Sequence, residues 1–535
     1  MSEQSGSDQT IAKPAVNPWF IAFTVTLATF MELLDTSIAN VSLPYIGGGL
    51  GRSYDEVTWI LTTYLVANAV VLPMSAWLSR VFGRKNYYLG CVALFTVTSF
   101  FCGLAPSLGI MLSSRVLQGI AGGGLAPVAQ AILVDTFPAA KRASAFAVYT
   151  IVIVTAPAIG PVLGGWITDN YNWRWIFFIN IPIGILAMLL TSRVVHDPPA
   201  FAEERASARK NGKLSIDGIG IALIAIASAT LEITLDRGQI EDWFGSTMIC
   251  WTLAIGVLGW IATVLWELRA EDPVIDFRLL KSRNFAIASA MFLVFGFGLF
   301  GSTTLLPQML QQLYGYRATD AGLVLGPGAL VITVLAPVGA QLIQRQIATP
   351  RVLLILSSVI GAFAMWNYAS FTLATDYRHY LLARCLQGLG YAFFFVPASL
   401  VAYSQLRPDQ NNRASSLTNL FRNWGGSMGV AFIITASERR VQYHQTITGS
   451  TGDASAQLLP GRIAGLKEYL IQKGFTGPDA DLASPAYFYH QLQHQVSLLS
   501  FMDCFRVIGW VTLAAIPLLL LVKKFTPDGK APTAH

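Results

Sequence analysis

Apolar runs of roughly 20 residues recur from one end of the chain to the other, separated by short polar stretches. A helix that crosses a bilayer needs about 20 apolar residues, because it rises 1.5 Å per residue through a hydrocarbon core of about 30 Å. The pattern therefore predicts an all-α polytopic membrane protein with fourteen transmembrane helices. The predicted spans are residues 19–43, 57–78, 86–104, 110–134, 144–168, 174–195, 216–235, 245–267, 284–307, 318–344, 350–371, 378–402, 412–436 and 499–522.

The composition supports this prediction. Apolar residues make up 53% of the chain and charged residues only 12%, whereas soluble proteins carry about 25% charged residues. We attribute the net charge of +6 to loop topology and expect no nucleic-acid partner. The five cysteines lie within apolar runs at no metal-ligand spacing, so we expect no disulfide framework, no bound metal and no cofactor.

Lysine and arginine indicate which side of the membrane each loop occupies. Positive loops stay in the cytoplasm, so the loops after the second and fourth spans are expected there, together with both termini. We expect residues 1–18 to form a disordered cytoplasmic N-terminus and residues 523–535 a cytoplasmic tail. Residues 438–497 form the long outer loop.

Three short motifs occur twice in the same order, 263 to 271 residues apart. They are Leu43-Pro44 with Leu306-Pro307, Arg115-x-x-Gln118-Gly119 with Arg384-x-x-Gln387-Gly388, and Arg142-Ala143-Ser144 with Arg413-Ala414-Ser415. This repeat predicts two parallel six-helix bundles, residues 19–195 and 284–522, the second of which includes the outer loop. Residues 196–283 then form a linker that carries two inserted helices.

Ionisable residues inside the spans are the candidates for a functional site. Glu32 and Asp35 are three residues apart in the first span, so they share a helical face. An ionisable group at the bilayer centre costs at least about 2.5 kcal/mol and usually serves a function. We predict a proton relay of Asp35 and Glu32 with Arg115 as their counter-ion, or else Arg115 is a snorkelling anchor at the interface.

A second acidic pair occurs in the first inserted span. Glu232 and Asp236 share a face near the outer surface, and either of them could relay protons. An ion pair of Asp236 with Arg237 at the helix end is an equally good interpretation. Arg422 is a buried cation in span 412–436 for which the sequence offers no partner.

Two motifs are candidates for gating. In the motif Gly160-Pro161-x-x-Gly164-Gly165 of the fifth span, Gly160 and Gly164 form a small-residue stripe with Ala156, and Pro161 bends the helix. The stripe predicts either a tight helix crossing or a sliding contact between the halves. After the second span, Gly83 and Arg84 form a basic turn. That turn either reflects topology alone or pairs with an acid such as Asp135 to hold an inner gate shut.

Aromatic residues of the central helices suggest an apolar substrate pocket. Phe295, Tyr391 and Phe394 are the candidates, with Asn40 and Gln118 as polar contacts. Packing or lipid contact is the alternative for most aromatic residues. In the outer loop, residues 486–496 predict an amphipathic helix whose two histidines lack a third metal ligand, so a docking surface for an extracytoplasmic partner is favoured.

These motifs together resemble a known family, the major facilitator superfamily, in its fourteen-helix branch of drug:proton antiporters of the EmrB/QacA type. The likeness is greatest to the EmrB subgroup because of the long outer loop. The matching segments are Leu34 to Pro44, Arg115-x-x-Gln118-Gly119, Gly160-Pro161-x-x-Gly164-Gly165, Trp173 to Pro182 and Leu235 to Gly238. Ala76, Arg80 and Ala121 depart from the family pattern.

The resemblance implies proton-driven export of hydrophobic toxic compounds across a bacterial inner membrane. It also implies a periplasmic adaptor of the membrane-fusion type and an outer-membrane channel as partners. An exporter of a specific lipid, siderophore or metabolite is the main alternative. A sugar or amino-acid facilitator would lack the Gly160-Pro161 stripe, and a membrane enzyme is disfavoured because no catalytic set recurs on one membrane face.

Overall fold

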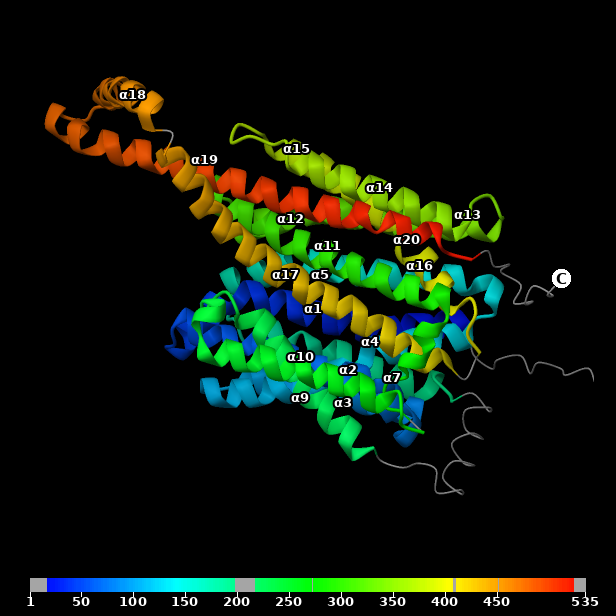
Figure 1. The fold of residues 1–535 in the computed structure, drawn as a ribbon. Helices are drawn as coiled ribbons and strands as arrows, with labels where there is room; N and C mark the ends of the chain where they lie inside the picture. The colour runs from blue at the N-terminus through cyan, green and yellow to red at the C-terminus, as the bar shows by residue number, and fades with distance from the viewer. Residues whose placement is uncertain (1–16, 198–216, 272, 408–409, 451, 524–535) are drawn as a thin grey trace, which may run out of the picture.

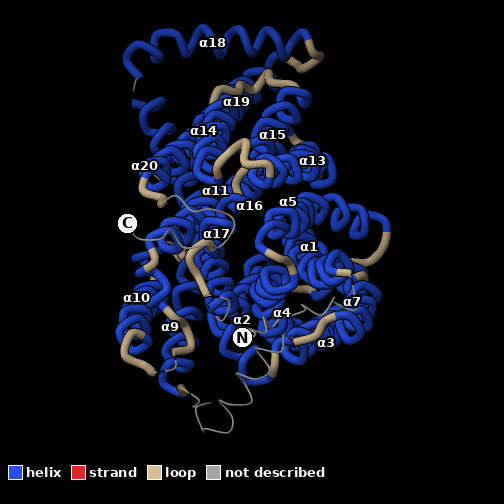
Figure 2. Tube along the Cα trace, turned by 90° about the vertical axis from the view of Figure 1, so that its right-hand side faces the viewer, coloured by secondary structure: helices blue, strands red, loops and turns tan. Residues whose placement is uncertain are grey.

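The computed structural model describes residues 17–197, 217–271, 273–407, 410–450 and 452–523. Within these ranges the protein is helical, with short loops and no strand (Figure 2). The predicted N-terminal tail, the first part of the linker (residues 198–216) and the predicted C-terminal tail lie almost wholly outside the described residues.

The helices fall into two groups (Figure 1), and a further pair of helices is inserted between them in the sequence. The N-terminal group comprises α1 (Pro18–Leu50), α2 (Tyr54–Phe82), α3 (Arg84–Leu104), α4 (Leu108–Thr136), α5 (Ala139–Asn170), α6 (Trp175–Phe178) and α7 (Asn180–Val194). The inserted pair is α9 (Gly218–Arg237) and α10 (Thr247–Glu267), joined by η1 (Trp243–Gly245). The C-terminal group starts with η2 (Phe277–Lys281) and comprises α11 (Arg283–Tyr314), α12 (Ala318–Leu323), α13 (Leu325–Gln344), α14 (Pro350–Tyr368), α15 (Tyr377–Ala392), α16 (Phe395–Tyr403), α17 (Asn411–Ser450), α18 (Gly452–Gln472), α19 (Gly477–Ala514) and α20 (Ile516–Leu520). The inserted pair lies against α2 and α17.

Thirteen helical stretches among the described residues are long and apolar enough to cross a membrane. The remaining predicted span, 412–436, belongs to α17, which is more polar but packs along α11 and α19 inside the bundle. The predicted fold class, an all-α polytopic membrane protein, is confirmed.

Glycines allow the closest helix crossings. A Cβ atom on Gly119 of α4 would lie 2.4 Å from the backbone oxygen of Tyr64 in α2. In the C-terminal group, a Cβ on Gly296 of α11 would lie 2.0 Å from the backbone oxygen of Arg422 in α17. Small residues at such crossings replace the hydrophobic driving force that helices lack in lipid. They hold α2 against α4 and α11 against α17, and these helices carry the polar groups described below.

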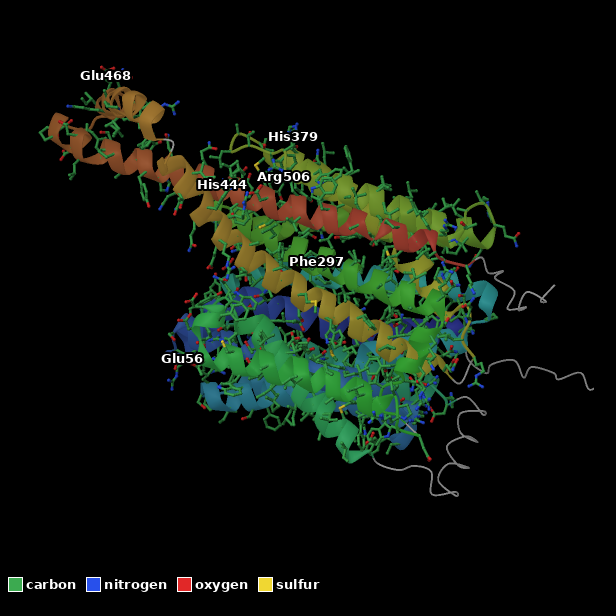
Figure 3. All side chains as sticks on the ribbon, in the orientation of Figure 1. Glu56, Phe297, His379, His444, Glu468 and Arg506 are labelled. Atoms are coloured by element: carbon green, nitrogen blue, oxygen red, sulfur yellow. The ribbon has the colours of Figure 1, made fainter. Side chains whose placement is uncertain are left out.

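Helices α17 and α19 continue beyond the bundle and carry α18 at their far end, where Figure 3 places Glu468. At the base of this projection, Asp503 of α19 accepts hydrogen bonds from Arg440 Nε (2.6 Å), His444 Nε2 (2.9 Å) and Arg506 Nη1 (3.0 Å). Arg440 and His444 belong to α17, so this cluster ties the two long helices together where they leave the other helices.

Candidate functional site

Asp35 lies at the centre of a buried ion-pair network in the N-terminal group. Its Oδ2 accepts a hydrogen bond from Arg115 Nη1 at 2.6 Å. Its Oδ1 accepts from Gln118 Nε2 at 3.1 Å and from Asn180 Nδ2 at 2.6 Å. Asp35 is 2% exposed and Arg115 is not exposed at all. The pair is therefore a fully desolvated contact among α1, α4 and α7, which excludes the snorkelling alternative for Arg115.

The partners of Asp35 are themselves held in place. Arg115 Nε donates to the backbone oxygen of Ile60 at 3.2 Å, and the guanidinium lies 4.4 Å from the centre of the Tyr64 ring. Gln118 Oε1 accepts from Arg115 at 2.7 Å, and its Nε2 also donates to Ser99 at 2.7 Å. Both ends of the Gln118 amide are thus occupied inside the protein. In this conformation the Gln118 amide is not free to contact a substrate, because its polar atoms bind the ion pair and Ser99.

Glu32 lies one turn before Asp35 in a different environment. Its Oε1 accepts a single hydrogen bond, from Asn68 Nδ2 of α2 at 3.2 Å, and its buried Oε2 has no hydrogen-bond partner within the described structure. The positive charge of Arg422 on α17, in the C-terminal group, acts on this carboxylate. Two guanidinium nitrogens of Arg422, Nε and Nη1, are buried without a hydrogen bond. Glu32 and Arg422 therefore attract one another across the two groups, although no direct ion pair joins them.

Asn180 was not predicted to belong to this site, and Arg422 was predicted as a buried cation without a partner. Asn180 follows an apolar run that starts at Trp175, and an amide inside such a run is the signal that would have identified it. The role of Arg422 had no such signal, because its partner Glu32 lies in another helix group.

Glu232 holds the inserted pair against the other helices. Its Oε1 accepts a hydrogen bond from Ser427 of α17 at 2.8 Å. One turn later, Asp236 accepts from Thr62 of α2, and Arg237 pairs with Glu241 at 3.0 Å. The interpretation of Asp236 and Arg237 as a helix-end ion pair is wrong, since each has another partner. Glu232 thus joins α9 to α17, and Asp236 joins α9 to α2; no hydrogen bond among the described residues connects Glu232 with Glu32 or Asp35.

The two groups meet at the end of the bundle that carries the basic turn after α2. Arg84 pairs with Asp135 of α4, whose Oδ1 accepts from Asn411 of α17 at 2.9 Å. Gly83, which precedes Arg84, has a φ of 86° and caps both α2 and α3. The positive φ is readily adopted by glycine, and the turn directs Arg84 toward Asp135.

Further hydrogen bonds close the same end. They join Ser75 with Ser416 (2.8 Å), Gln130 with Asn419 (2.6 Å), Ser415 with the backbone of Pro127 (2.6 Å) and Ser144 with Gln344 (2.8 Å). Each pair has one member in the N-terminal group and one in the C-terminal group, so this end is closed in the structure.

The small-residue stripe of α5 packs inside the N-terminal group. A Cβ on Gly160 would lie 2.3 Å from Ser37 Oγ, and one on Gly164 would lie 3.1 Å from Ile38 of α1. Gly165 is buried beside them. Gly160 and Gly164 therefore form the predicted tight helix crossing with α1, and they do not form a sliding contact between the halves. Pro161 lies on the other side of α5 and packs against Gly322 of α12 in the C-terminal group.

Three of the predicted substrate contacts form a compact aromatic cluster in the C-terminal group. The rings of Phe295 and Phe394 are nearly parallel with centroids 4.2 Å apart, and Tyr391 meets Phe295 edge-on at 5.3 Å. All three side chains are buried. Asn40 is exposed on α1, in the other group, and no hydrogen bond is found for it among the described residues. In this conformation the aromatic side chains pack against one another, and Asn40 is not part of the cluster.

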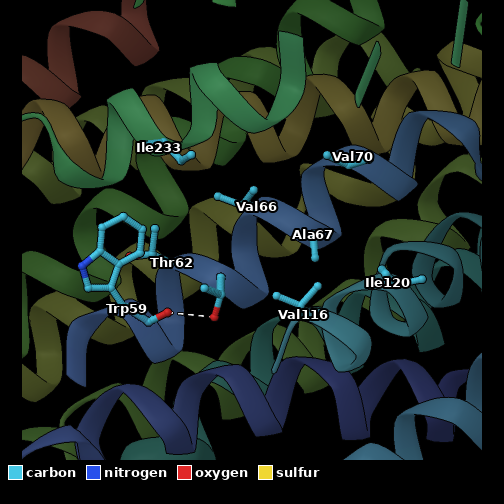
Figure 4. A pocket seen from close by; sticks show the side chains of 9 residues that line it. Trp59, Thr62, Val66, Ala67, Val70, Val116, Ile120 and Ile233 are labelled. Atoms are coloured by element: carbon cyan, nitrogen blue, oxygen red, sulfur yellow. Dashed lines mark hydrogen bonds between the residues drawn. The ribbon is translucent and has the colours of Figure 1, made fainter. Parts of the chain in front are cut away.

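A groove of about 320 Å³ lies between α2, α4 and α9 (Figure 4). Its walls are almost wholly apolar and include Trp59, Val66, Val116, Ile120 and Ile233. No feature of the sequence pointed to it, because it exists only where α9 lies beside α2 and α4.

The comparisons with known proteins agree with this architecture. The model of the Major Facilitator Superfamily matches residues 25–430. Multidrug export protein EmrB of Escherichia coli (strain K12) is 33% identical over 98% of this chain and 99% of its own length. Fatty acid resistance protein FarB of Neisseria gonorrhoeae is 36% identical over 81% of this chain and 83% of its own.

Among solved structures, the human organic anion transporter MFSD10 covers 94% of this chain and 100% of its own, with a TM-score of 0.59. Its sequence identity is 12%, so this likeness concerns the fold alone. The helix arrangement and the buried polar site define a multi-pass membrane transporter rather than an enzyme. The chain belongs to the major facilitator superfamily and, within it, to the EmrB-type subgroup of export proteins.

Proposed function

We propose that this protein is a proton-driven multidrug antiporter that exports hydrophobic toxic compounds across a bacterial inner membrane. The observation that carries the proposal is a pair of buried carboxylates one turn apart in unlike environments. Asp35 is paired with Arg115, whereas Glu32 has no hydrogen-bonded cation and faces Arg422 of the other group. The names of the relatives, which include multidrug export proteins, support the same function.

The two carboxylates have different tasks in this mechanism. Three donors stabilise the charged form of Asp35, so it serves as a fixed counter-ion that shapes the site. Glu32 accepts one hydrogen bond and exchanges the proton. With its charge present, Glu32 attracts Arg422 and favours the closed inner end seen here. When a proton arrives from outside, this attraction is lost and the inner ends part.

Glu32 then releases the proton on the inner side while a compound binds. Release restores the attraction between Glu32 and Arg422, the inner end closes, and the compound is exported. One proton that moves down about 150 mV releases roughly 3.5 kcal/mol, which supports a concentration ratio of a few hundredfold. Phe295, Tyr391 and Phe394 supply apolar area for the compound once the groups move, and Asn40 and Gln118 remain the polar candidates.

Transport in proteoliposomes with an imposed pH gradient tests the proposal. A panel of hydrophobic dyes, drugs and lipids is loaded, and proton counterflow is measured with a pH-sensitive dye. We expect several chemically unrelated compounds to move, each accompanied by protons in the opposite direction. Movement of one lipid or metabolite alone would favour a dedicated exporter, and transport without proton counterflow would refute the antiport mechanism.

The projection of α17, α18 and α19 is our proposed contact for a periplasmic adaptor of the membrane-fusion type and, through it, an outer-membrane channel (Figure 3). Leu482 and Tyr489 are exposed on this part of α19 and offer apolar side chains to such a partner. Crosslinking from these two positions in intact cells is expected to capture the adaptor. We also propose that both termini lie in the cytoplasm, which the positively charged loops support.

A further inference from the structure

The C-terminal group contains a buried cation that lacks the carboxylate its counterpart possesses. Arg384 of α15 occupies the position that Arg115 holds in α4, as the shared Arg-x-x-Gln-Gly motif shows. Arg384 is 2% exposed, and Nη1 donates to Gln387 at 2.5 Å just as Arg115 donates to Gln118. No carboxylate of the described residues forms an ion pair with Arg384, and its buried Nε has no hydrogen bond.

The position of the missing acid can be identified. The Leu-Pro motifs that align α1 with α11 place Gly298 where α1 has Asp35. A Cβ on Gly298 would meet the Tyr391 hydroxyl at 3.4 Å, and Tyr391 accepts a hydrogen bond from Gln387 Nε2 at 3.1 Å. Gly298 therefore faces the Arg384–Gln387 network, with room for a side-chain carbon in ordinary contact.

A charge buried without a counter-ion is strongly unfavourable, so an anion from outside the chain would satisfy this site. Its apolar surroundings indicate what kind of anion fits. Phe295 lies one turn before Gly298 on α11, and its ring contacts both Tyr391 and Phe394. The polar donors are thus continuous with the aromatic cluster.

We propose that Arg384, Gln387 and the surface of Gly298 form a binding subsite for the carboxylate of an amphiphilic organic anion, whose apolar body lies against the aromatic cluster. This subsite rests on the proposed export function and assigns it one class of substrate. In the structure the cluster is closed over the subsite, so the ligand enters when the aromatic side chains separate.

Equilibrium dialysis of the purified full-length protein in detergent tests the subsite. The probe is 2-naphthoate, and the neutral match is 2-naphthamide. We expect the wild-type protein to bind naphthoate at least tenfold more tightly than naphthamide. Arg384→Gln should lose this preference, Arg384→Lys should keep part of it, and the exposed charge control Arg345→Gln should not change it.

Gly298→Asp provides a test that does not depend on removing a buried charge. The new carboxylate would pair with Arg384, so we expect loss of naphthoate preference together with a higher thermal unfolding midpoint. Equal naphthoate preference in the wild type and Gly298→Asp would overturn the proposal. Chloride is added as a competitor while the ionic strength is held constant. If chloride displaces naphthoate at a concentration equal to that of naphthoate, the assignment of the subsite to an amphiphile is overturned.

The export function is scored separately on the same preparations. Transport of a cationic dye, rhodamine 6G, by wild-type proteoliposomes shows whether the proposed antiport operates. If dye transport is present but the substitutions at positions 384 and 298 leave naphthoate binding unchanged, the subsite alone is refuted. If no compound is transported under a pH gradient, the export function itself fails.

Discussion

The two carboxylates of α1 lead to a prediction that separates stability from transport. Replacing Asp35 with asparagine removes the counter-ion of Arg115 and adds a third amide beside those of Gln118 and Asn180. Only one oxygen would remain to accept from Arg115, Gln118 and Asn180. Breaking a buried ion pair by removing one partner costs about 3–5 kcal/mol, because the other charge stays buried. We therefore expect Asp35→Asn to lose both thermal stability and transport.

Replacing Glu32 with glutamine should have a different effect. The Glu32 carboxylate accepts one hydrogen bond, from Asn68, and a glutamine oxygen can accept the same bond. Loss of one such interaction costs about 0.5–1.5 kcal/mol at most. Glu32→Gln should thus unfold close to the wild-type temperature yet show no proton-coupled transport, because the amide does not take up a proton.

The assay measures unfolding temperature in detergent and proton-coupled dye efflux in proteoliposomes on the same purified variants. Asp35→Asn combined with Arg115→Gln is the matched control, because it removes both charges and should recover part of the lost stability. Full transport by Glu32→Gln would refute the assignment of Glu32 as the proton carrier. An unfolding temperature of Asp35→Asn equal to that of the wild type would refute the argument from the buried ion pair.

Three other predictions concern closure, packing and the inserted helices. Cysteines that replace Ser75 and Ser416, whose hydroxyl oxygens are 2.8 Å apart, should form a disulfide that stops transport until it is reduced. Gly160→Val should lower the unfolding temperature because its Cβ would lie 2.3 Å from an α1 hydroxyl, whereas Gly90→Ala, with open space around it, should not. Glu232→Gln should retain transport because an amide oxygen still accepts the α17 hydroxyl, and Glu232→Leu should weaken the docking of α9, measured by protease sensitivity.

Contrary outcomes of these experiments are equally specific. Transport by the oxidised double-cysteine protein, with the single-cysteine variants as controls, would show that the closed end need not open. Similar unfolding temperatures of Gly160→Val and Gly90→Ala would contradict the close crossing of α5 with α1. Loss of proton counterflow in Glu232→Gln, with α9 still protected, would return Glu232 to the proton relay.

The membrane class, the helix pattern and the identity of the intramembrane ionisable residues could be predicted from residue type and spacing. Apolar runs of span length and the energetic cost of an intramembrane charge are local properties, so Glu32, Asp35 and Arg115 could be selected without coordinates. The repeated motifs also showed that Arg384 corresponds to Arg115. These inferences depend only on residue type and on spacing along one helix.

The tertiary structure alone decided how those residues are paired. Asp35 meets Asn180, 145 residues further along the chain, and Glu32 faces Arg422 in the other helix group. For the same reason the sequence left open whether the glycine stripe of α5 forms a tight helix crossing or a sliding contact between the halves, and the structure shows a close crossing with α1. Helix periodicity states which residues share a face, but the neighbour of that face depends on close packing of every helix at once, which only the folded arrangement determines.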